Sequence, residues 1–215
     1  MKITIIALIC LNLVASSLHL SSQTPVLHNF ITETNNSCYN GVITDGIYIY
    51  GTKTDGGTNG KGYIYKTKID GSSNEILLNF DGKGNGALPA GSFVFKNDTL
   101  FGITQSGGEN DYGTIYGIKK DGTGYFKLLD FNGTNGGNTF NTLTISENVL
   151  YVASVNGGSN GLLFKINIDG SGYSILHNFN GINGWNPSSP LAGEGDVLYG
   201  TTLRGAKMTM ACFIK

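Results

Sequence analysis

Histidine is too scarce in this chain to build a catalytic or metal centre. The sequence contains three histidines. His19 lies in the apolar N-terminal segment, while His28 and His177 occupy equivalent places in two copies of a repeated segment. The other copies carry Leu78 and Leu129 there, so the position is predicted to serve packing. A histidine zinc site or a Ser-His-Asp triad is therefore not expected, and no metal or other cofactor is predicted.

The acidic residues do not form an assignable catalytic pair either. Asp70, Asp121 and Asp169 each precede a glycine, which is typical of tight turns. A glycoside hydrolase needs two carboxyl groups that converge on one bond. The glutamates fall at different positions of the repeat: Glu33, Glu75, Glu109, Glu147 and Glu194. No catalytic residue is predicted.

Three polar loops resemble calcium-binding loops in their oxygen-rich composition. They span residues 81–86, 132–138 and 180–186. They lack the dense aspartate spacing and the terminal glutamate of an EF-hand, so polar turns with left-handed residues are expected instead. The other glycine-rich loops do not open helices, which argues against phosphate binding.

Side chains that change from one repeat to the next are the best candidates for ligand binding. Those with contact chemistry are Lys83, Glu109, Asp111, Tyr112 and Trp185. An exposed aromatic ring beside Asn, Asp and Gly suits contact with a sugar or a peptide. The alternative, that Trp185 packs beneath its own loop, stays open at this point.

A tandem repeat must position these residues. One segment recurs four times, at Leu27–Phe30, Leu77–Phe80, Leu128–Phe131 and Leu176–Phe179. Its phenylalanines are spaced by 50, 51 and 48 residues, and three further motif series keep the same register. The expected units are 31–80, 81–131, 132–179 and 180–215 together with 23–30, in one domain over residues 23–215.

Each unit is predicted to be a four-stranded antiparallel sheet. In the second unit the strands are expected at 92–96, 99–104, 114–119 and 125–131. Asp121–Gly122 between the last two predicts a hairpin with a type I′ turn. Strict alternation would place Ile76, Leu78 and Phe80 on one face, and Leu77 and Asn79 on the other. Apolar residues on both faces favour sheets covered on both sides, as in the blades of a small β-propeller.

The two ends of the repeat array are complementary. A lone last strand is expected at 24–30, while the final unit stops after its third strand at 210–215. Pairing these segments would complete a ring of four blades and remove exposed sheet edges. The alternatives are an open repeat array and a fragment of a larger propeller.

The N-terminal residues 1–22 read as a secretory signal peptide, which predicts a secreted or cell-surface protein. Lys2 precedes an apolar run over residues 5–14, and small residues follow it. An uncleaved membrane anchor is the alternative. No second apolar stretch of spanning length follows, so the mature chain is expected to have no membrane span. Whether Cys38 and Cys212 form a disulfide stays open.

The charge balance excludes some partners. Charged residues make up 13% of the chain, with a net charge of −1. A nucleic-acid partner or a polybasic membrane face would need a basic surface, so neither is expected.

Residues 176–202 resemble the GloVer-type tandem repeat of exported bacterial proteins. The matching pattern is Leu-His-Asn-Phe-Asn-Gly, then Asn-Gly, Pro and Leu-Tyr-Gly-Thr-Thr. Residues 113–118 and 169–173 match later parts of that repeat, and the resemblance extends over residues 26–215. It implies export and a propeller-like fold, but it implies no reaction and no catalytic residues. Departures from the pattern include Val152 in place of glycine.

Two functions remain open from the sequence. The first is a non-enzymatic binding or scaffold module outside the cell, with an unknown carbohydrate or protein ligand on its loops. The second is a secreted polysaccharide hydrolase or lyase with acidic residues on the loops. A cleft holding two carboxylates, one with a raised pKa, would favour the enzyme.

Overall fold

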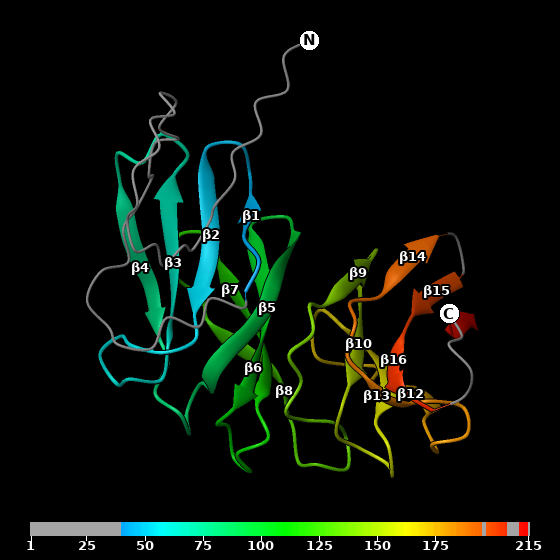
Figure 1. The fold of residues 1–215 in the computed structure, drawn as a ribbon. Helices are drawn as coiled ribbons and strands as arrows, with labels where there is room; N and C mark the ends of the chain where they lie inside the picture. The colour runs from blue at the N-terminus through cyan, green and yellow to red at the C-terminus, as the bar shows by residue number, and fades with distance from the viewer. Residues whose placement is uncertain (1–39, 195–196, 206–210, 215) are drawn as a thin grey trace, which may run out of the picture.

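A computed structural model describes residues 40–194, 197–205 and 211–214, and all regular elements in these ranges are β-strands (Figure 1). The first twelve strands are β1 (Ile43–Thr44), β2 (Tyr48–Lys53), β3 (Tyr63–Lys68), β4 (Asn74–Asn79), β5 (Ala87–Lys96), β6 (Thr99–Ser106), β7 (Thr114–Lys119), β8 (Phe126–Asp130), β9 (Thr144–Ser146), β10 (Val149–Ser154), β11 (Leu162–Asn167) and β12 (Ser174–Asn178). The last unit contains β13 (Trp185–Pro187), β14 (Ala192–Glu194), β15 (Val197–Gly200), β16 (Thr202–Arg204) and β17 (Ala211–Ile214).

Three consecutive groups of four strands form antiparallel meanders, which confirms the predicted all-β repeat. The first sheet has the order β1-β2-β3-β4, the second β5-β6-β7-β8, and the third β9-β10-β11-β12. In the second sheet, the third strand lies at the predicted residues 114–119, whereas the first strand begins earlier, at Ala87. That first strand carries an irregularity between Ala90 and Val94. The apolar pattern marked only the part of the strand after this irregularity.

The hairpins between the third and fourth strands of these sheets contain the expected glycines but correct the predicted turn type. Gly122 and Gly170 both have φ of +85°. Asp121 does not have positive φ, so the turn is not type I′. The Gly122 amide donates to the Lys119 carbonyl at 2.9 Å, and the Lys119 amide donates to the Thr123 carbonyl at 3.0 Å. This pattern is a three-residue loop, in which only the glycine needs a left-handed backbone.

A β-bulge interrupts the predicted alternation of the fourth strand. Ile64 pairs with Leu78 and Tyr65 with Ile76, so Leu77 is the extra residue. The same shift occurs in the second and third sheets. Because a bulge shifts the alternation, Ile76 is 49% exposed while Phe80 is fully buried. The expectation of one common face for these residues is therefore wrong.

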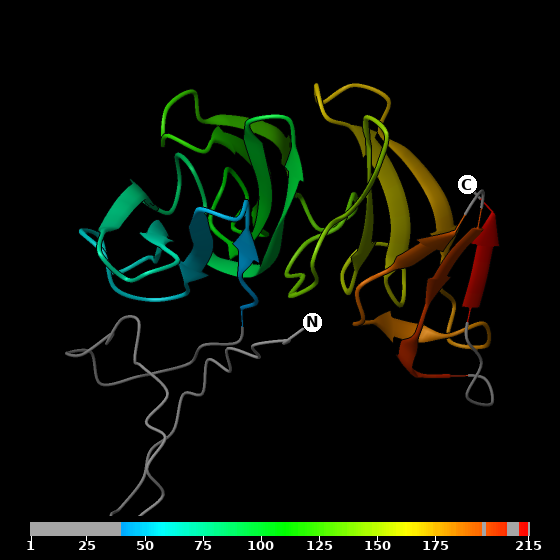
Figure 2. The same ribbon diagram turned by 90° about the horizontal axis from the view of Figure 1, so that it is seen from above.

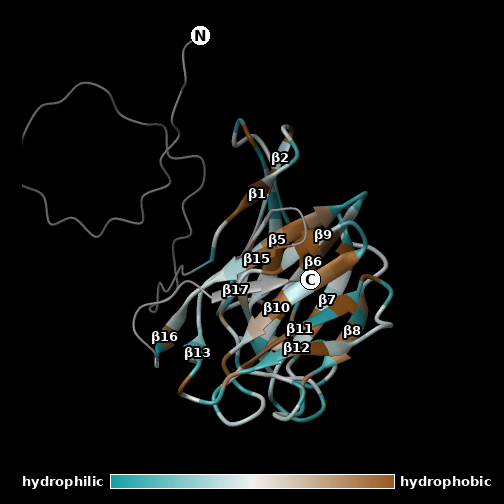
Figure 3. Cartoon of the chain, turned by 90° about the vertical axis from the view of Figure 1, so that its right-hand side faces the viewer, coloured by the Kyte–Doolittle hydropathy of each residue, from teal (hydrophilic) through white to brown (hydrophobic). Residues whose placement is uncertain are grey.

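Neighbouring sheets pack face to face through apolar clusters and through the bulges. The largest cluster joins the second and third sheets and includes the fully buried Phe131 and Phe164. Gly122 of the second sheet lies against the bulged Leu77 of the first, since an added Cβ would be 3.1 Å from the Leu77 carbonyl oxygen. The Tyr125 hydroxyl adds a bond of 2.9 Å to the Asn85 carbonyl. Figure 3 shows hydrophobic residues mostly in the strands and hydrophilic residues mostly in the connecting loops.

The last unit departs from the other three. Its first and second strands are each divided, so it forms a pair β13-β16 and a three-stranded sheet β14-β15-β17. The described sheets follow one another along an open arc, with the first and last units at its two ends, which is consistent with the open-array alternative (Figure 2). The predicted pairing of residues 24–30 with the last strand lies outside the described residues.

Candidate ligand-binding face

The loops that join the second strand to the third, and one sheet to the next, lie at the lower end of the sheets in Figure 1. We call residues 54–62, 80–88, 107–113, 131–138, 155–161, 179–186 and 204–205 the loop face. Backbone hydrogen bonds connect its loops: Leu88 N to Lys61 O at 3.0 Å, Gly108 N to Gly82 O at 2.8 Å, Asn138 N to Tyr112 O at 2.9 Å, Asn156 N to Gly137 O at 3.4 Å, and Asn186 N to Asn160 O at 3.0 Å. The loops therefore make one connected surface across the units.

Three of the predicted site residues lie in two adjoining loops. Lys83 is exposed in the loop at 80–88, which contacts the loop of Glu109 and Asp111. The Glu109 side chain is exposed, and its amide donates to Asp130 Oδ1 at 3.2 Å. Asp111 Oδ1 accepts the Gly107 amide at 2.7 Å and so closes its own loop. Asp111 thus shapes the loop, while Lys83 and Glu109 present their charges to solvent.

Tyr112 connects the second unit to the third. Its ring packs on two glycines of the next loop, because a Cβ at Gly133 or Gly137 would lie 2.9 or 2.8 Å from the Tyr112 side chain. The side chain remains 36% exposed. The structure therefore gives Tyr112 a fixed orientation with part of its surface open to solvent.

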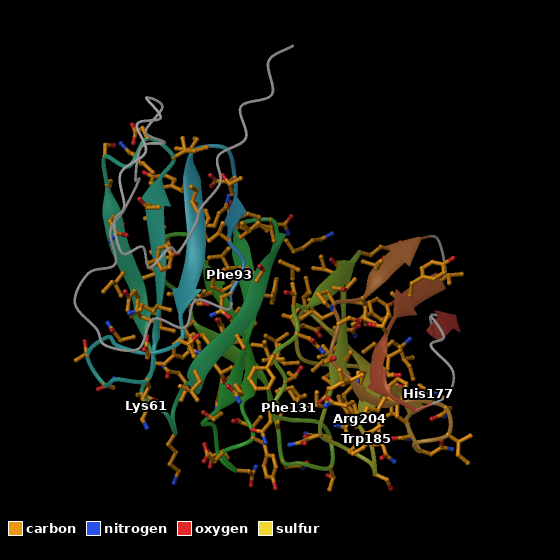
Figure 4. All side chains as sticks on the ribbon, in the orientation of Figure 1. Lys61, Phe93, Phe131, His177, Trp185 and Arg204 are labelled. Atoms are coloured by element: carbon orange, nitrogen blue, oxygen red, sulfur yellow. The ribbon has the colours of Figure 1, made fainter. Side chains whose placement is uncertain are left out.

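Trp185 lies further along the same face, in β13, and it is not packed beneath its own loop. Its side chain is 44% exposed. Trp185 pairs with Arg204 of β16, and the guanidinium carbon lies 5.5 Å from the ring centroid, within range of a cation–π interaction. Figure 4 shows the two side chains together at the lower end of the last unit.

Sequence reasoning missed Arg204 as a site residue. Its signal was present in the repeat, because the equivalent positions carry Asp55, Ser106 and Asn156. It is also the single arginine of the sequence. The strand pairing with Trp185 could not be inferred from the sequence, since β16 continues a strand that is unbroken in the other units.

The oxygen-rich loops use their side-chain oxygens for turns. Asp81 Oδ1 accepts the amides of Gly84 and Asn85, at 2.7 and 2.9 Å. Asn132 Oδ1 and Asn180 Oδ1 accept backbone amides two and three residues ahead in the same way. Within the part of the chain that the structure describes, no group of three His, Cys, Asp or Glu residues could hold a metal ion.

His177 has the contacts of a packing residue. It pairs with Leu163, as Leu129 pairs with Ile115 in the second sheet. Its ring makes an edge contact with Phe179 at 4.8 Å, and its Nε2 lies 2.9 Å from the Asn183 amide nitrogen. His28 lies outside the described residues.

The strongest carboxyl perturbation lies away from the loop face, at the junction of the first and second sheets. Partial burial alone would raise the pKa of Asp45. Hydrogen bonds from the amides of Tyr48 and Ile47 and from the Tyr50 hydroxyl, together with the positive charge of Lys120, outweigh this effect and lower the pKa to about 2. The turn residues Asp70, Asp121 and Asp169 also have lowered pKa values. Each accepts hydrogen bonds from the hydroxyl and the amide of the residue two positions ahead, which is Ser72, Thr123 or Ser171.

Two further features bear on the class of site. A small, largely apolar hollow between the third sheet and the last unit is lined by residues that include Phe179, Pro187 and Leu191. It carries no carboxylate in its lining and lies in the packing between units.

Among residues 40–194, 197–205 and 211–214, no helix has the length and hydrophobicity to cross a membrane.

Solved structures with similar folds include a TolB candidate from Agrobacterium tumefaciens (TM-score 0.52, 15% identity, 76% of this chain and 53% of that one) and TolB from Acinetobacter baumannii (TM-score 0.52, 14% identity, 78% and 38%). A gluconolactonase from Xanthomonas campestris is similar to a comparable degree (TM-score 0.50, 15% identity, 78% and 58%). The chain spans about half the length of these proteins, which show that its fold is propeller-like and carry no function over to it.

No curated protein matches the sequence significantly. A family profile, however, matches residues 14–213, almost the whole chain, and confirms the resemblance that the repeat motifs indicated. The chain belongs to the Gloeobacter/Verrucomicrobia repeat family.

Proposed function

We propose that the protein is exported and acts outside the cell as a non-enzymatic binding module, which holds a carbohydrate on its loop face. The observation that carries this proposal is the pattern at the three junctions between units. Each junction keeps the same backbone hydrogen bond, donated by Leu88, Asn138 or Asn186. Constant backbone geometry with changing side chains is what a rigid scaffold with a variable contact surface requires.

The side chains at these junctions differ in a way that suits contact with a ligand. The first junction presents Lys61 beside Ala87, and the second presents Tyr112 beside Gly137. The third presents Trp185, with Asn160 in the neighbouring loop. Each junction thus exposes one large side chain, and two of the three are aromatic. Aromatic faces bind the C–H faces of sugar rings, and the surrounding asparagines suit sugar hydroxyl groups.

Three carboxylates in or beside the loop face are engaged in local contacts, which supports binding rather than catalysis. Asp81 and Asp111 accept backbone amides within their own loops. Asp130 accepts the Glu109 amide through one oxygen and pairs with Lys127 through the other at 2.7 Å. These groups hold the loops in shape, and a glycosidase would need a carboxyl pair free to act on a bound substrate.

The test is a glycan array probed with purified protein from residue 23 onward, followed by titration with the best-bound glycan. Replacing both Tyr112 and Trp185 with alanine should weaken binding at least about tenfold, because two stacking surfaces are lost. Ile47→Ala is the control. Ile47 is also exposed, at 63%, but it lies in the connection between β1 and β2, away from the loop face.

Three results would contradict the proposal. Unchanged affinity in the folded double variant would place the site elsewhere on the molecule. Cleavage of a bound glycan by the wild-type protein would make it an enzyme. Retention of the full-length chain in the cytoplasm of an expressing host, with residues 1–22 intact, would refute export.

A further inference from the structure

The single tryptophan and the single arginine of the sequence form a pair on the loop face. Trp185 and Arg204 are directly opposite each other in β13 and β16, and the guanidinium carbon lies 5.5 Å from the ring centroid. The repeat does not require either residue. The position of Trp185 is occupied by Ala87 and Gly137 in other units, and those units keep the equivalent backbone hydrogen bond at the next residue.

The charge of Arg204 is not neutralised within the described structure. No described carboxylate lies within 4 Å of its guanidinium group, whereas Lys53, Lys66, Lys120 and Lys127 all pair with carboxylates. The adjoining loop at 179–184 contains no acidic residue, and Asn160, Asn180 and Asn183 supply neutral amides nearby. An exposed arginine held over an aromatic ring, without an acidic partner, is suited to bind an external anion.

Resting on the proposed function, we infer that Trp185 and Arg204 recognise a carboxylate-bearing sugar, that is, a uronic acid residue of an acidic polysaccharide. The exposed part of the indole would contact the C–H face of the sugar ring. The guanidinium, already oriented by the ring, would bind the sugar carboxylate through two parallel N–H donors. The Asn160 side chain, in the loop whose carbonyl accepts the Asn186 amide, would bond a hydroxyl group.

The surroundings favour an acidic sugar over an acidic peptide. The loops next to the pair consist mainly of Gly, Asn, Ser and Thr, at residues 132–138, 156–161 and 180–186. A stable protein interface needs a well-packed centre of large side chains, which these loops do not supply. Ile182, at 82% exposure, and Leu203, at 64%, are two exposed apolar side chains in this otherwise polar setting.

Trp185 also provides the measurement. Because it is the only tryptophan, its fluorescence reports on this site alone. We would titrate the protein from residue 23 onward with an oligogalacturonate, with its methyl ester, and with polyglutamate. The ester keeps the sugar ring and removes the charge. The expected result is an affinity for the acid at least about tenfold above that for the ester, with no saturable response to polyglutamate.

Variants at position 204 separate charge from packing. Arg204→Gln should lower the affinity for the acid to that for the ester, and Arg204→Lys should restore part of the difference. Both are exposed substitutions, and thermal melting would verify folding. The wild-type comparison of acid with ester is decisive even if a variant fails to fold.

The outcomes distinguish this inference from the proposed function. Equal affinity for acid and ester would overturn the role of Arg204 and leave a neutral-sugar module. A saturable response to polyglutamate alone would overturn the sugar class. No fluorescence response to either oligosaccharide would overturn the inference, while binding of another glycan on the array would still support the proposed function.

Discussion

The second sheet and the last unit come from the same repeat but serve different purposes. In the second sheet, β5 to β8 form one continuous meander, and apolar clusters shared with the first and third sheets cover both of its faces. In the last unit, the first and second strands are each split, and Trp185 and Arg204 are exposed. The difference indicates that large side chains are constrained where units stack and are free to vary at the loop face.

The two kinds of aromatic residue should show this difference most clearly. Phe131 is fully buried between the second and third sheets, so Phe131→Ala should destabilise the protein by about 3–5 kcal/mol through lost burial and a residual cavity. Trp185→Ala should cost less than about 1 kcal/mol, since much of the ring is already in water. Urea denaturation of both variants measures the contrast. Similar losses would mean that Trp185 is also a packing residue.

A buried amide joins the third sheet to the last unit. Asn141 is 4% exposed, and its Nδ2 donates to the carbonyls of Ala153 and Pro187, each at 2.9 Å. Asn141→Leu should cost about 2–3 kcal/mol because two buried carbonyls lose their donor. Ser189 holds the equivalent position in the last unit and is more exposed, so Ser189→Ala should cost less than about 1 kcal/mol by the same denaturation assay. Equal effects would remove the distinction between stacked and free units.

Alanine substitution at two turn glycines distinguishes the cost of backbone strain from the cost of a steric contact between neighbouring sheets. Gly122 (φ +85°) would place a Cβ 3.1 Å from the Leu77 carbonyl oxygen, whereas Gly46 (φ +92°) has open space. Replacement by alanine should cost about 1 kcal/mol at Gly46 from strain alone, and about 1 kcal/mol more at Gly122. Thermal melting of both variants tests this. A larger loss at Gly46 would show that the turn of the second sheet does not stack closely on the first.

The acid stability of the first junction should depend on Asp45. Its Oδ2 accepts the Tyr50 hydroxyl at 3.0 Å and pairs with Lys120 of the second sheet at 3.5 Å. Since its folded pKa of about 2 lies below the ordinary 3.8, ionised Asp45 stabilises the fold above about pH 4, and this contribution is lost as the pH falls toward 2.

Asp45→Asn should therefore lower the free energy of unfolding by about 1 kcal/mol at pH 6, after allowance for solvent screening, and by much less at pH 2. Urea melts at both pH values give the comparison. Asp98→Asn is the matched control, because Asp98 approaches the same lysine at 3.5 Å but its side chain is 88% exposed. A loss that did not diminish at pH 2 would contradict the assigned role of the Asp45 charge.

Much of the scaffold could be predicted from the sequence, because each repeat encodes the same strands and turn glycines. The bulge at Leu77 could not, since a bulge depends on pairing with β3, and the apolar pattern of one strand does not reveal it. The Asp-Gly dipeptide marked the hairpin at Gly122 but not its loop length, which led to the wrong turn type. Rare residues at variable positions supplied the candidate site residues, and the sequence prediction omitted Arg204 because its partner lies across a strand pair.

The smallest expected effect concerns His177, and it tests whether matching positions of the repeat are interchangeable. His177 occupies the place of Leu78 and Leu129, and its Nε2 contact with Asn183 lies at the exposed edge of the loop face. His177→Leu should change the free energy of unfolding by less than about 0.5 kcal/mol, because added apolar burial against Phe179 offsets a solvent-exposed hydrogen bond. A loss above about 1 kcal/mol, or reduced glycan binding in the folded variant, would show that the last unit uses this histidine where the second sheet uses a leucine, and the loop face would then extend to β12.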